Sequence, residues 1–335
     1  MKTLRVFFVF SAISGGLGGA AVIALNPHSA LAQDWPTRPV TLVVPFGAGG
    51  SSDVIGRVVA EGLRSQLGQP VIVENIGGAG GMIGASRVAK AAADGYQFVI
   101  GNVGTHAQNQ FVYRKPLYDA VRDFTPVGLV ADQSLVLITR KDFPAAGLRE
   151  FMAYAKANQD KLRYGSSGAG GSNHLACVLF NAAAGLDVAH VPYRGGSQAM
   201  QDLIAGRLDY QCPSGPVALP QIEGRTVKAI ALLRKNRSPS MPGLPSAGEQ
   251  GLTDFDIPSW YALFLPKGTP SAIVEKLHKA TVAALDMPSV QKGLIDVGSD
   301  LVPPEHRSLE YLGKFVAAEV EKWGKIINAS NVQIN

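Results

Sequence analysis

The chain has few of the residues and motifs on which catalytic and metal sites depend. Only two cysteines, Cys177 and Cys212, occur in 335 residues, too few for a cysteine-based zinc site. The six histidines show neither H-E-x-x-H nor another metal-ligand spacing. The serine-hydrolase elbow G-x-S-x-G also fails, because Ala169 stands where the last glycine of the segment starting at Gly165 should be. We therefore expect no enzyme activity, no bound metal and no cofactor.

Signatures of nucleotide and nucleic-acid binding are missing as well. In three glycine clusters the G-x-G-x-x-G fingerprint fails, because Ser52, Ile83 and Asn173 replace its last glycine. The formal net charge is +5, but the lysines and arginines form no run, so we expect no nucleic-acid partner. A mild positive balance instead suits a small anionic ligand. Beyond the first residues, glycine, proline or charge interrupts every apolar run before it is long enough to span a membrane.

Residues 1–32 have the pattern of a secretory signal peptide. Lys2 and Arg5 precede an apolar, glycine-rich stretch, and residues 30–32 read Ala-Leu-Ala, the small-residue pattern of a cleavage site. The alternative is a membrane anchor, but residues 26–28 end the apolar stretch before the roughly 20 residues that a span requires. We expect export and cleavage after Ala32.

Export bears on the two cysteines. Disulfides form in oxidising compartments, and an even number of cysteines in an exported protein favours pairing. The spacing of Cys177 and Cys212 is also compatible with two buried free thiols. We expect a disulfide between them.

What the chain does contain is two copies of the pentapeptide Gly-Ala-Gly-Gly-Ser, at residues 47–51 and 168–172. Each copy follows a strand-like run and precedes a helix-like one, so its backbone N–H groups lie at the positive end of a helix dipole. Ser166 and Ser167 add hydroxyl groups beside the second copy. A third cluster, residues 77–81, is interpreted as a simple turn. The two copies predict a small acidic ligand that is held from both sides.

Strand-like and helix-like segments alternate after the leader. We expect strands at residues 40–44, 71–74 and 96–101, separated by helices at 52–67 and 82–93. This alternation is typical of an α/β fold in which helices cover both faces of a parallel sheet. Ligands in such folds bind beyond the carboxyl ends of the strands, where the glycine loops lie.

The later part of the chain repeats this pattern, which predicts two doubly wound lobes. Lobe 1 is expected to comprise residues 33–134 plus 237–335, and lobe 2 residues 135–236. Two crossings, near residues 131–136 and 233–237, would then form a two-strand hinge.

Some single residues are further candidates for the site. Thr105 and His106 end a strand of lobe 1 and are expected to face the cleft. Arg194 is suited to bidentate pairing with a carboxylate or, alternatively, to an ion pair with Asp202 or Asp209.

Three more residues near the predicted strand ends have structural alternatives. Asp53 lies in the first turn of its helix, where a carboxylate caps N–H groups, and it would repel an anionic ligand. Trp260 and Tyr261 supply either an aromatic wall of the cleft or core packing.

Ordered blocks from residue 35 nearly to the C-terminus carry a family resemblance. They are Trp35-Pro36-Thr37-Arg38-Pro39-Val40, Val44-Pro45-Phe46-Gly47-Ala48-Gly49-Gly50-Ser51-Ser52-Asp53, Val73-Glu74-Asn75, Asp94-Gly95-Tyr96, Tyr164-Gly165-Ser166-Ser167-Gly168, His190-Val191-Pro192-Tyr193-Arg194-Gly195 and Leu265-Pro266-Lys267-Gly268-Thr269-Pro270. Together they resemble the Bug family, the periplasmic solute receptors of tripartite tricarboxylate transporters.

The resemblance implies a two-lobed periplasmic binding protein of type II topology. Such a protein closes like a Venus flytrap on a small organic carboxylate and delivers it to membrane permease subunits; we expect it to act as a monomer. Two alternatives are an exported sensor that signals to a membrane partner and an exported hydrolase. The resemblance implies a set of ligand-binding residues, to which the first pentapeptide adds Ser51. The full set is Phe46, Gly47, Ala48, Gly49, Ser51, Thr105, His106, Ser166, Ser167, Gly168, Arg194, Ser214 and Trp260.

One block departs from the family pattern. Many members carry Phe-Asp after the strand that follows Asp209, whereas this chain has Gln211-Cys212-Pro213-Ser214. The chemistry of the distal part of the pocket is therefore expected to differ.

Overall fold

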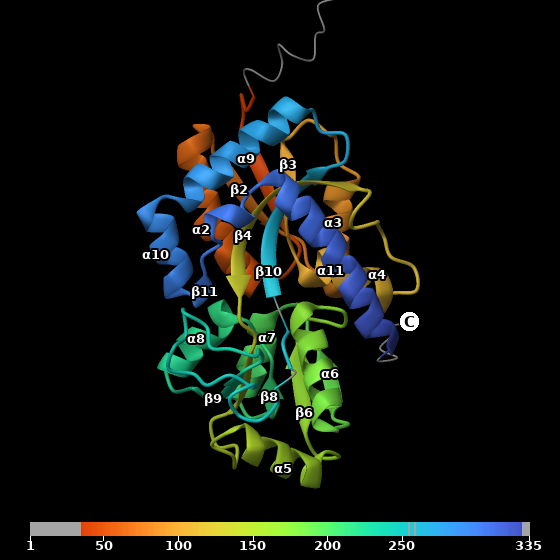
Figure 1. Ribbon diagram of the computed structural model, residues 1–335, viewed down its shortest axis with the longest axis vertical. Helices are drawn as coiled ribbons and strands as arrows, with labels where there is room; N and C mark the ends of the chain where they lie inside the picture. Colours follow the sequence, from red (N-terminus) through yellow and green to blue (C-terminus); the bar gives the residue numbers. More distant parts are fainter. Residues whose placement is uncertain (1–34, 254, 258, 330–335) are drawn as a thin grey trace, which may run out of the picture.

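The computed structural model of the protein describes residues 35–253, 255–257 and 259–329, so the expected leader at residues 1–32 lies outside the described residues. Figure 1 shows two lobes stacked along the long axis of the molecule. The sheet of lobe 1 has the strand order β11-β4-β10-β3-β1-β2, and that of lobe 2 has the order β7-β6-β8-β5-β9. Among the described residues, no helix combines the length and the apolar character needed to cross a membrane.

Lobe 1 is built from two stretches of chain that are far apart in the sequence. The first contributes β1 (Val40–Val44), α2 (Ser51–Leu67), β2 (Val71–Asn75), α3 (Met82–Ala89), β3 (Gln97–Asn102), the π-helical turn η2 (Gly104–Gln108), α4 (Asn109–Val112) and β4 (Phe124–Gln133). The second contributes β10 (Ser259–Pro266), α9 (Ser271–Leu285), α10 (Pro288–Asp296), β11 (Ser299–Asp300) and α11 (Leu309–Ala329).

The sheet of lobe 1 is mixed and not wholly parallel. β1 runs parallel to β2 and β3, but β10 runs antiparallel to both β3 and β4. The reason is that β4 leaves the lobe at Gln133 and β10 enters it at Ser259, and these two residues pair with each other. A strand that returns where another leaves must run in the opposite direction.

The residues of β1 show how both faces of this sheet are covered. Leu42 and Val44 pack into a core cluster with residues of α2, α9 and α10, whereas Val43 points to the other face, toward α3 and α11. This alternation is expected for a strand buried on both sides.

Lobe 2 repeats this architecture with shorter strands. Its elements are β5 (Val136–Arg140), α5 (Leu148–Asn158), β6 (Arg163–Ser166), α6 (Ser172–Ala184), β7 (Ala189–Pro192), α7 (Gly196–Ile204), β8 (Tyr210–Gln211), α8 (Gly215–Glu223) and β9 (Val227–Leu232). β6 is parallel to β7 and β8, and β5 is antiparallel to β8 and β9. The predicted disulfide is present: Cys177 and Cys212 are bonded, with their Cα atoms 5.6 Å apart.

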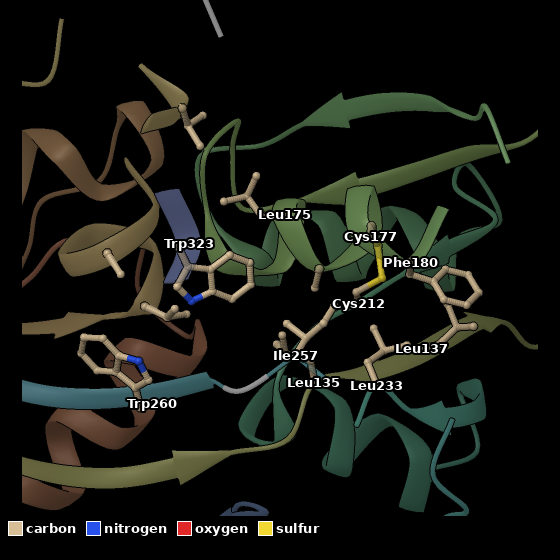
Figure 2. Packing of buried hydrophobic residues seen from close by; sticks show 14 of the residues in the cluster. Leu135, Leu137, Leu175, Cys177, Phe180, Cys212, Leu233, Ile257, Trp260 and Trp323 are labelled. Atoms are coloured by element: carbon tan, nitrogen blue, oxygen red, sulfur yellow. A yellow bond between two sulfur atoms is a disulfide. The ribbon is translucent and has the colours of Figure 1, made fainter. Parts of the chain in front are cut away.

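The lobes share part of their core. Figure 2 shows Trp260 and Trp323 of lobe 1 on one side of Leu135 and Ile257, with the disulfide of lobe 2 on the other side. These residues belong to one continuous cluster of buried side chains. The hinge therefore runs through packed apolar side chains.

The return crossing of the hinge lies later in the chain than expected. Ser246 pairs with Leu232, the Phe255 ring packs 6.1 Å from Phe180, and the N–H of Ile257 donates to Leu233. The segment after β9 therefore packs on lobe 2 as far as residue 257. The expected crossing at residues 233–237 moves to a point between Ile257 and Ser259, because the described residues after β9 stay on the surface of lobe 2.

Candidate functional site

The two Gly-Ala-Gly-Gly-Ser loops share a left-handed residue at the same place. The second glycine of each has positive φ, 74° at Gly49 and 80° at Gly170. Each of these glycines donates its N–H to the side chain four residues later: Gly49 to Asp53 Oδ2 at 2.8 Å and Gly170 to His174 Nδ1 at 3.2 Å. Since these two N–H groups are bonded within the loops, the N–H groups of the following helix turns are the ones left for a ligand.

A small cavity, here called the interlobe cavity, lies where the two loops face each other. Its lining residues are Phe46, Gly50, Ser51, Ser52, Asn102, Leu135, Ser167, Ser172, Asn173, Gly196, Pro213, Ser214, Val217 and Tyr261. Its volume is about 30 Å³. This space holds only a few water-sized groups, so the lobes are closed on each other.

Four helices begin at the interlobe cavity. α2 presents Ser51 and Ser52, α6 presents Ser172 and Asn173, α7 presents Gly196, and Ser214 is the residue before α8. No side chain caps any of these four helices. The positive ends of four helix dipoles therefore converge on one small space, which favours an anion.

The polar groups in the cavity wall are uncharged hydroxyls and amides. Within the described residues, no lysine, arginine, aspartate or glutamate lines the cavity. Tyr261 comes from β10 and lies near Ser214, Ser52 and Asn102. Burial raises the pKa of Tyr261, although the hydrogen bonds of these neighbours lower it. The phenol therefore stays protonated and can donate a hydrogen bond.

Asp53 holds the first loop in place from behind. Its carboxylate accepts hydrogen bonds from Gly49 and from Asn75 Nδ2, at 3.0 Å, and pairs with Arg57. Asn75 also donates to the carbonyl of Phe46. Burial opposes ionisation of Asp53, but the bonds from Arg57, Gly49 and Asn75 outweigh it and lower its pKa. Asp53 thus has a structural role, as its position in the sequence indicates, but it bonds the loop N–H of Gly49 and does not cap α2.

Two histidines have the corresponding place behind the second loop. The rings of His174 and His190 are 4.1 Å apart, and His190 Nε2 lies 2.7 Å from Ser166 Oγ. Burial, together with the charge of His190, lowers the pKa of His174 to about 3. Burial lowers that of His190 to about 4. Both rings are therefore neutral at ordinary pH.

Of the side chains predicted from the sequence, four line the interlobe cavity: Phe46, Ser51, Ser167 and Ser214. The other loop residues flank it. Ala48 accepts a hydrogen bond from Ser197 of lobe 2, and a Cβ atom at Gly47 would lie 3.6 Å from the carbonyl oxygen of Arg194. The backbones of the two lobes are therefore close here, at a distance that would still leave ordinary van der Waals contact for a Cβ atom.

Ser166 and Gly168 also stand close to the cavity without forming its wall. Ser166 is buried against His190, and Gly168 adopts a φ of 115°, with its carbonyl accepting from Gly171. They shape the second loop, as Gly49 shapes the first.

Thr105 and His106 lie in the interior of lobe 1 and do not line the cavity. The Thr105 hydroxyl is 2.9 Å from both the Asn102 N–H and His106 Nδ1. The ring of His106 stacks on Phe264, with ring centroids 3.9 Å apart. The π-helical turn after β3 directs both side chains into the core.

Arg194 and Trp260 also lie apart from the cavity wall. The Arg194 side chain is exposed. Trp260 precedes Tyr261 on β10, so the two side chains point to opposite faces of the sheet. The Trp260 indole donates to Glu319 Oε2 at 3.1 Å on the side away from the cavity.

The expected ligand-binding residues left out several that line the cavity: Gly50 and Ser172 of the two pentapeptides, Tyr261, which was an alternative for the cleft wall, and Ser52, Asn102, Leu135, Asn173, Gly196, Pro213 and Val217. The lining residues that directly follow the two loops could have been predicted from the sequence. They begin a helix, and the first N–H groups of a helix have no partner within it. No such signal existed for Leu135 and Val217, which come from the hinge and from a helix that the periodicity did not reveal.

A third glycine cluster also joins the lobes. A Cβ atom at Gly80 would lie 2.6 Å from the carbonyl oxygen of Ala169, so only glycine allows this approach. Tyr113 donates its hydroxyl to the same carbonyl at 2.6 Å. The cluster at 77–81 is a turn, as predicted, and is also a contact surface between the lobes.

A family model and several solved structures each match this chain along most of its length. The model of the tripartite tricarboxylate transporter family receptor matches residues 55–332. The periplasmic binding protein BugD has a TM-score of 0.86 and 35% identity, with 90% of this chain and 100% of BugD covered.

Two further solved structures contain ligands. MatC of Rhodopseudomonas palustris, with bound malate, has a TM-score of 0.84 and 37% identity, covering 88% of this chain and 100% of MatC. Another R. palustris protein, with adipate, has a TM-score of 0.85 and 34% identity. The match covers 90% of this chain and 100% of the R. palustris chain.

Proposed function

The chain belongs to the tripartite tricarboxylate transporter receptor family, and we propose that it captures a small carboxylate between its lobes in the periplasm and delivers it to membrane permease subunits. It is a solute-binding receptor and not an enzyme. The malate of MatC and the adipate of the second R. palustris protein support a carboxylate ligand. The observation that carries the proposal is the convergence of four helix N-termini on one cavity.

Both lobes contribute donors to the bound anion. The N–H groups and hydroxyls of Ser51 and Ser52 act from lobe 1, while those of Ser172 and the amide of Asn173 act from lobe 2. Hydrogen bonds to a charged group contribute about 1.5–3 kcal/mol each, so a few of them suffice for micromolar binding. Because the donors are divided between the lobes, a carboxylate bridges them and favours the closed form.

The absence of charge in the described cavity wall bears on the choice of ligand. A ligand with an ammonium group needs a carboxylate partner when it is buried. Since no aspartate or glutamate lines the cavity, we propose that organic acids without an amine bind better than amino acids.

The test is a calorimetric titration of the purified protein with mono-, di- and tricarboxylic acids, their amino-acid analogues and neutral sugars. We expect at least one amine-free carboxylate to bind with micromolar affinity. We expect Tyr261→Phe to weaken binding about tenfold, because it removes one hydrogen bond to a charged group. Tyr154→Phe, which removes a hydroxyl from α5, is the matched control and is expected to bind normally. Binding of sugars without binding of any carboxylate would overturn the proposal.

A further inference from the structure

A second cavity lies on the opposite side of β10 from the interlobe cavity. We call it the Asp132 pocket; it has a volume of about 220 Å³ and is lined by Leu129, Asp132, Trp260, Leu301, Val302, Pro303, His306, Tyr311 and Phe315. All of these residues belong to lobe 1. The proposed carboxylate site uses none of them, so the pocket needs an explanation of its own.

Aromatic rings form much of its wall. Tyr311 stacks on His306 with ring centroids 4.2 Å apart and planes inclined by 12°, and its ring lies 5.8 Å from Phe315. Trp260 packs against Phe315 at 5.4 Å. The Trp260 indole donates its N–H to the buried carboxylate of Glu319, which leaves the ring richer in electrons. Rings of this kind attract cations to their faces.

The only acidic side chain in the wall of the pocket, within the described residues, is Asp132. Its side chain remains 44% exposed, so a ligand entering from solvent can reach it. Burial raises the pKa of Asp132, although Arg234 lowers it. Burial and the negative charges of Asp132 and Glu319 also raise the pKa of Tyr311. Asp132 and Glu319 thus both place negative charge near the Tyr311 ring.

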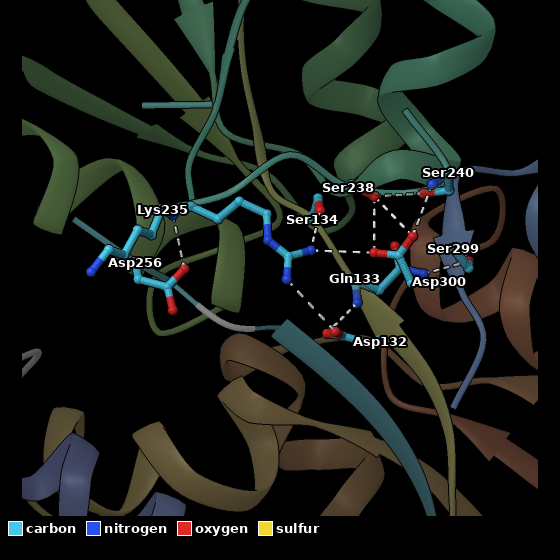
Figure 3. Close-up of polar contacts among 10 residues, drawn as sticks. Asp132, Gln133, Ser134, Lys235, Ser238, Ser240, Asp256, Ser299 and Asp300 are labelled. Atoms are coloured by element: carbon cyan, nitrogen blue, oxygen red, sulfur yellow. Dashed lines mark hydrogen bonds and ion pairs between the residues drawn. The ribbon is translucent and has the colours of Figure 1, made fainter. Parts of the chain in front are cut away.

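The basic side chains nearby are bound more closely to other partners than to Asp132. The Arg234 guanidinium contacts Asp300 at 3.2 Å and Ser134 at 2.8 Å but approaches Asp132 only to 3.9 Å (Figure 3). Arg307 pairs with Asp286 at 2.6 Å. Asp132 Oδ1 also accepts the Gln133 N–H at 2.8 Å, so it is Oδ2, held only by the long Arg234 contact, that can accept a further cationic partner.

We propose that the Asp132 pocket binds a small organic cation, an alkylguanidinium or alkylammonium group with a short apolar body. The charged head would pair with Asp132, and the body would lie against Tyr311 and Phe315. The pocket would then be a second ligand site, of opposite charge preference to the interlobe cavity and separated from it by β10.

The test is a ligand-observed NMR titration of the purified protein at fixed ionic strength, with n-butylguanidinium as the probe. Its neutral analogue of the same shape, n-butylurea, serves as the comparison. We expect saturable binding of butylguanidinium and about tenfold weaker binding of butylurea, as for a charge pair assisted by aromatic faces.

Two substitutions locate the site. Asp132→Asn keeps the side-chain shape and is expected to weaken butylguanidinium binding about tenfold. Asp160→Asn removes the same charge from an exposed turn of lobe 2 and is expected to change nothing. Thermal melting of both variants checks that they fold. Equal binding of the two probes, or equal affinity of Asp132→Asn and the unsubstituted protein, would overturn the proposal.

Discussion

Asp53 and His174 occupy equivalent positions behind the two loops, yet one is a carboxylate and the other a neutral imidazole. Both accept the N–H of the second glycine of their loop. The carboxylate has Arg57 as a counter-ion, whereas the imidazole is packed against a second histidine and must remain neutral to accept. The same loop geometry is therefore sensitive to pH in lobe 2.

This difference predicts how stability changes with pH. The pKa of His174 is about 3 in the folded protein and near 6.5 in an unfolded chain, so below pH 6.5 the unfolded state binds more protons. The free energy of unfolding should therefore fall as the pH decreases from 6.5 toward 3. Between pH 7 and pH 5, His174 alone accounts for a loss of about 2 kcal/mol.

The check is urea unfolding of the unsubstituted protein and of His174→Asn at pH 7 and pH 5. Asn keeps an acceptor near the position of Nδ1 but does not titrate, so the variant should lose about 2 kcal/mol less than the parent. His106 and His190 also have lowered pKa values and still titrate in the variant, so some pH dependence persists. Identical losses in the two proteins would show that His174 does not contribute.

At the scale of elements, the disulfide ties together two parts of the lobe 2 site. Cys177 lies in α6, whose first residues are Ser172 and Asn173, and Cys212 lies two residues before Ser214. The bond thus fixes one helix N-terminus relative to another. It also closes a loop of 35 residues.

Loss of this bond should destabilise the protein. Closure of a loop of this length removes conformational entropy from the unfolded chain, worth about 4 kcal/mol. We expect Cys177→Ala together with Cys212→Ala to lower the free energy of unfolding in urea by this amount and to weaken carboxylate binding. The control is the parent protein after reduction, which should unfold at the same urea concentration as the variant. A loss of less than about 1 kcal/mol would contradict the entropic account.

The elements themselves were largely predictable from the sequence. Apolar periodicity predicted β1 with the bounds that it has in the structure, and α2 and β2 to within one residue. It missed α8, because Pro220 lies inside that helix, where proline is unusual. The direction of β10 was also missed, because it depends on where the chain returns from lobe 2.

The site was predictable only where the signal is local. The loops could be recognised because five consecutive residues determine their geometry. Trp260 and Tyr261 were both visible as an aromatic pair, but alternation along a strand does not say which face meets the other lobe. Thr105 and His106 were placed at the cleft because nothing in the sequence marks the π-helical turn that directs them inward.

At the scale of the whole molecule, the lobes touch beside the interlobe cavity, where Ser197 of lobe 2 donates to the carbonyl of Ala48. A ligand that is held between the lobes therefore enters when they separate. Asp300 of lobe 1 links to the segment that follows β9 through Ser238 Oγ, at 2.8 Å, and the Ser240 N–H, at 3.0 Å (Figure 3). These bonds lie beside the hinge, so they can persist while the distant loops separate.

Closure should depend on the glycine contact between the lobes. Gly80 and Gly206 both have positive φ, of 59° and 73°, so replacement by alanine strains the backbone at both positions. Only at Gly80 does the added Cβ meet the other lobe, 2.6 Å from the Ala169 carbonyl oxygen, whereas at Gly206 it meets nothing within 4 Å. Gly80→Ala should therefore hinder closure, and Gly206→Ala should show the effect of the strain alone.

Small-angle X-ray scattering with and without a bound carboxylate measures this difference. The parent protein and Gly206→Ala should become more compact when the ligand is added, because the ligand bridges the lobes. Gly80→Ala should remain more extended and bind about tenfold more weakly, since binding then has to work against a steric contact. Equal compaction of all three proteins would mean that the loops close without the 77–81 contact, and the lobes would then be held by the ligand and the hinge alone.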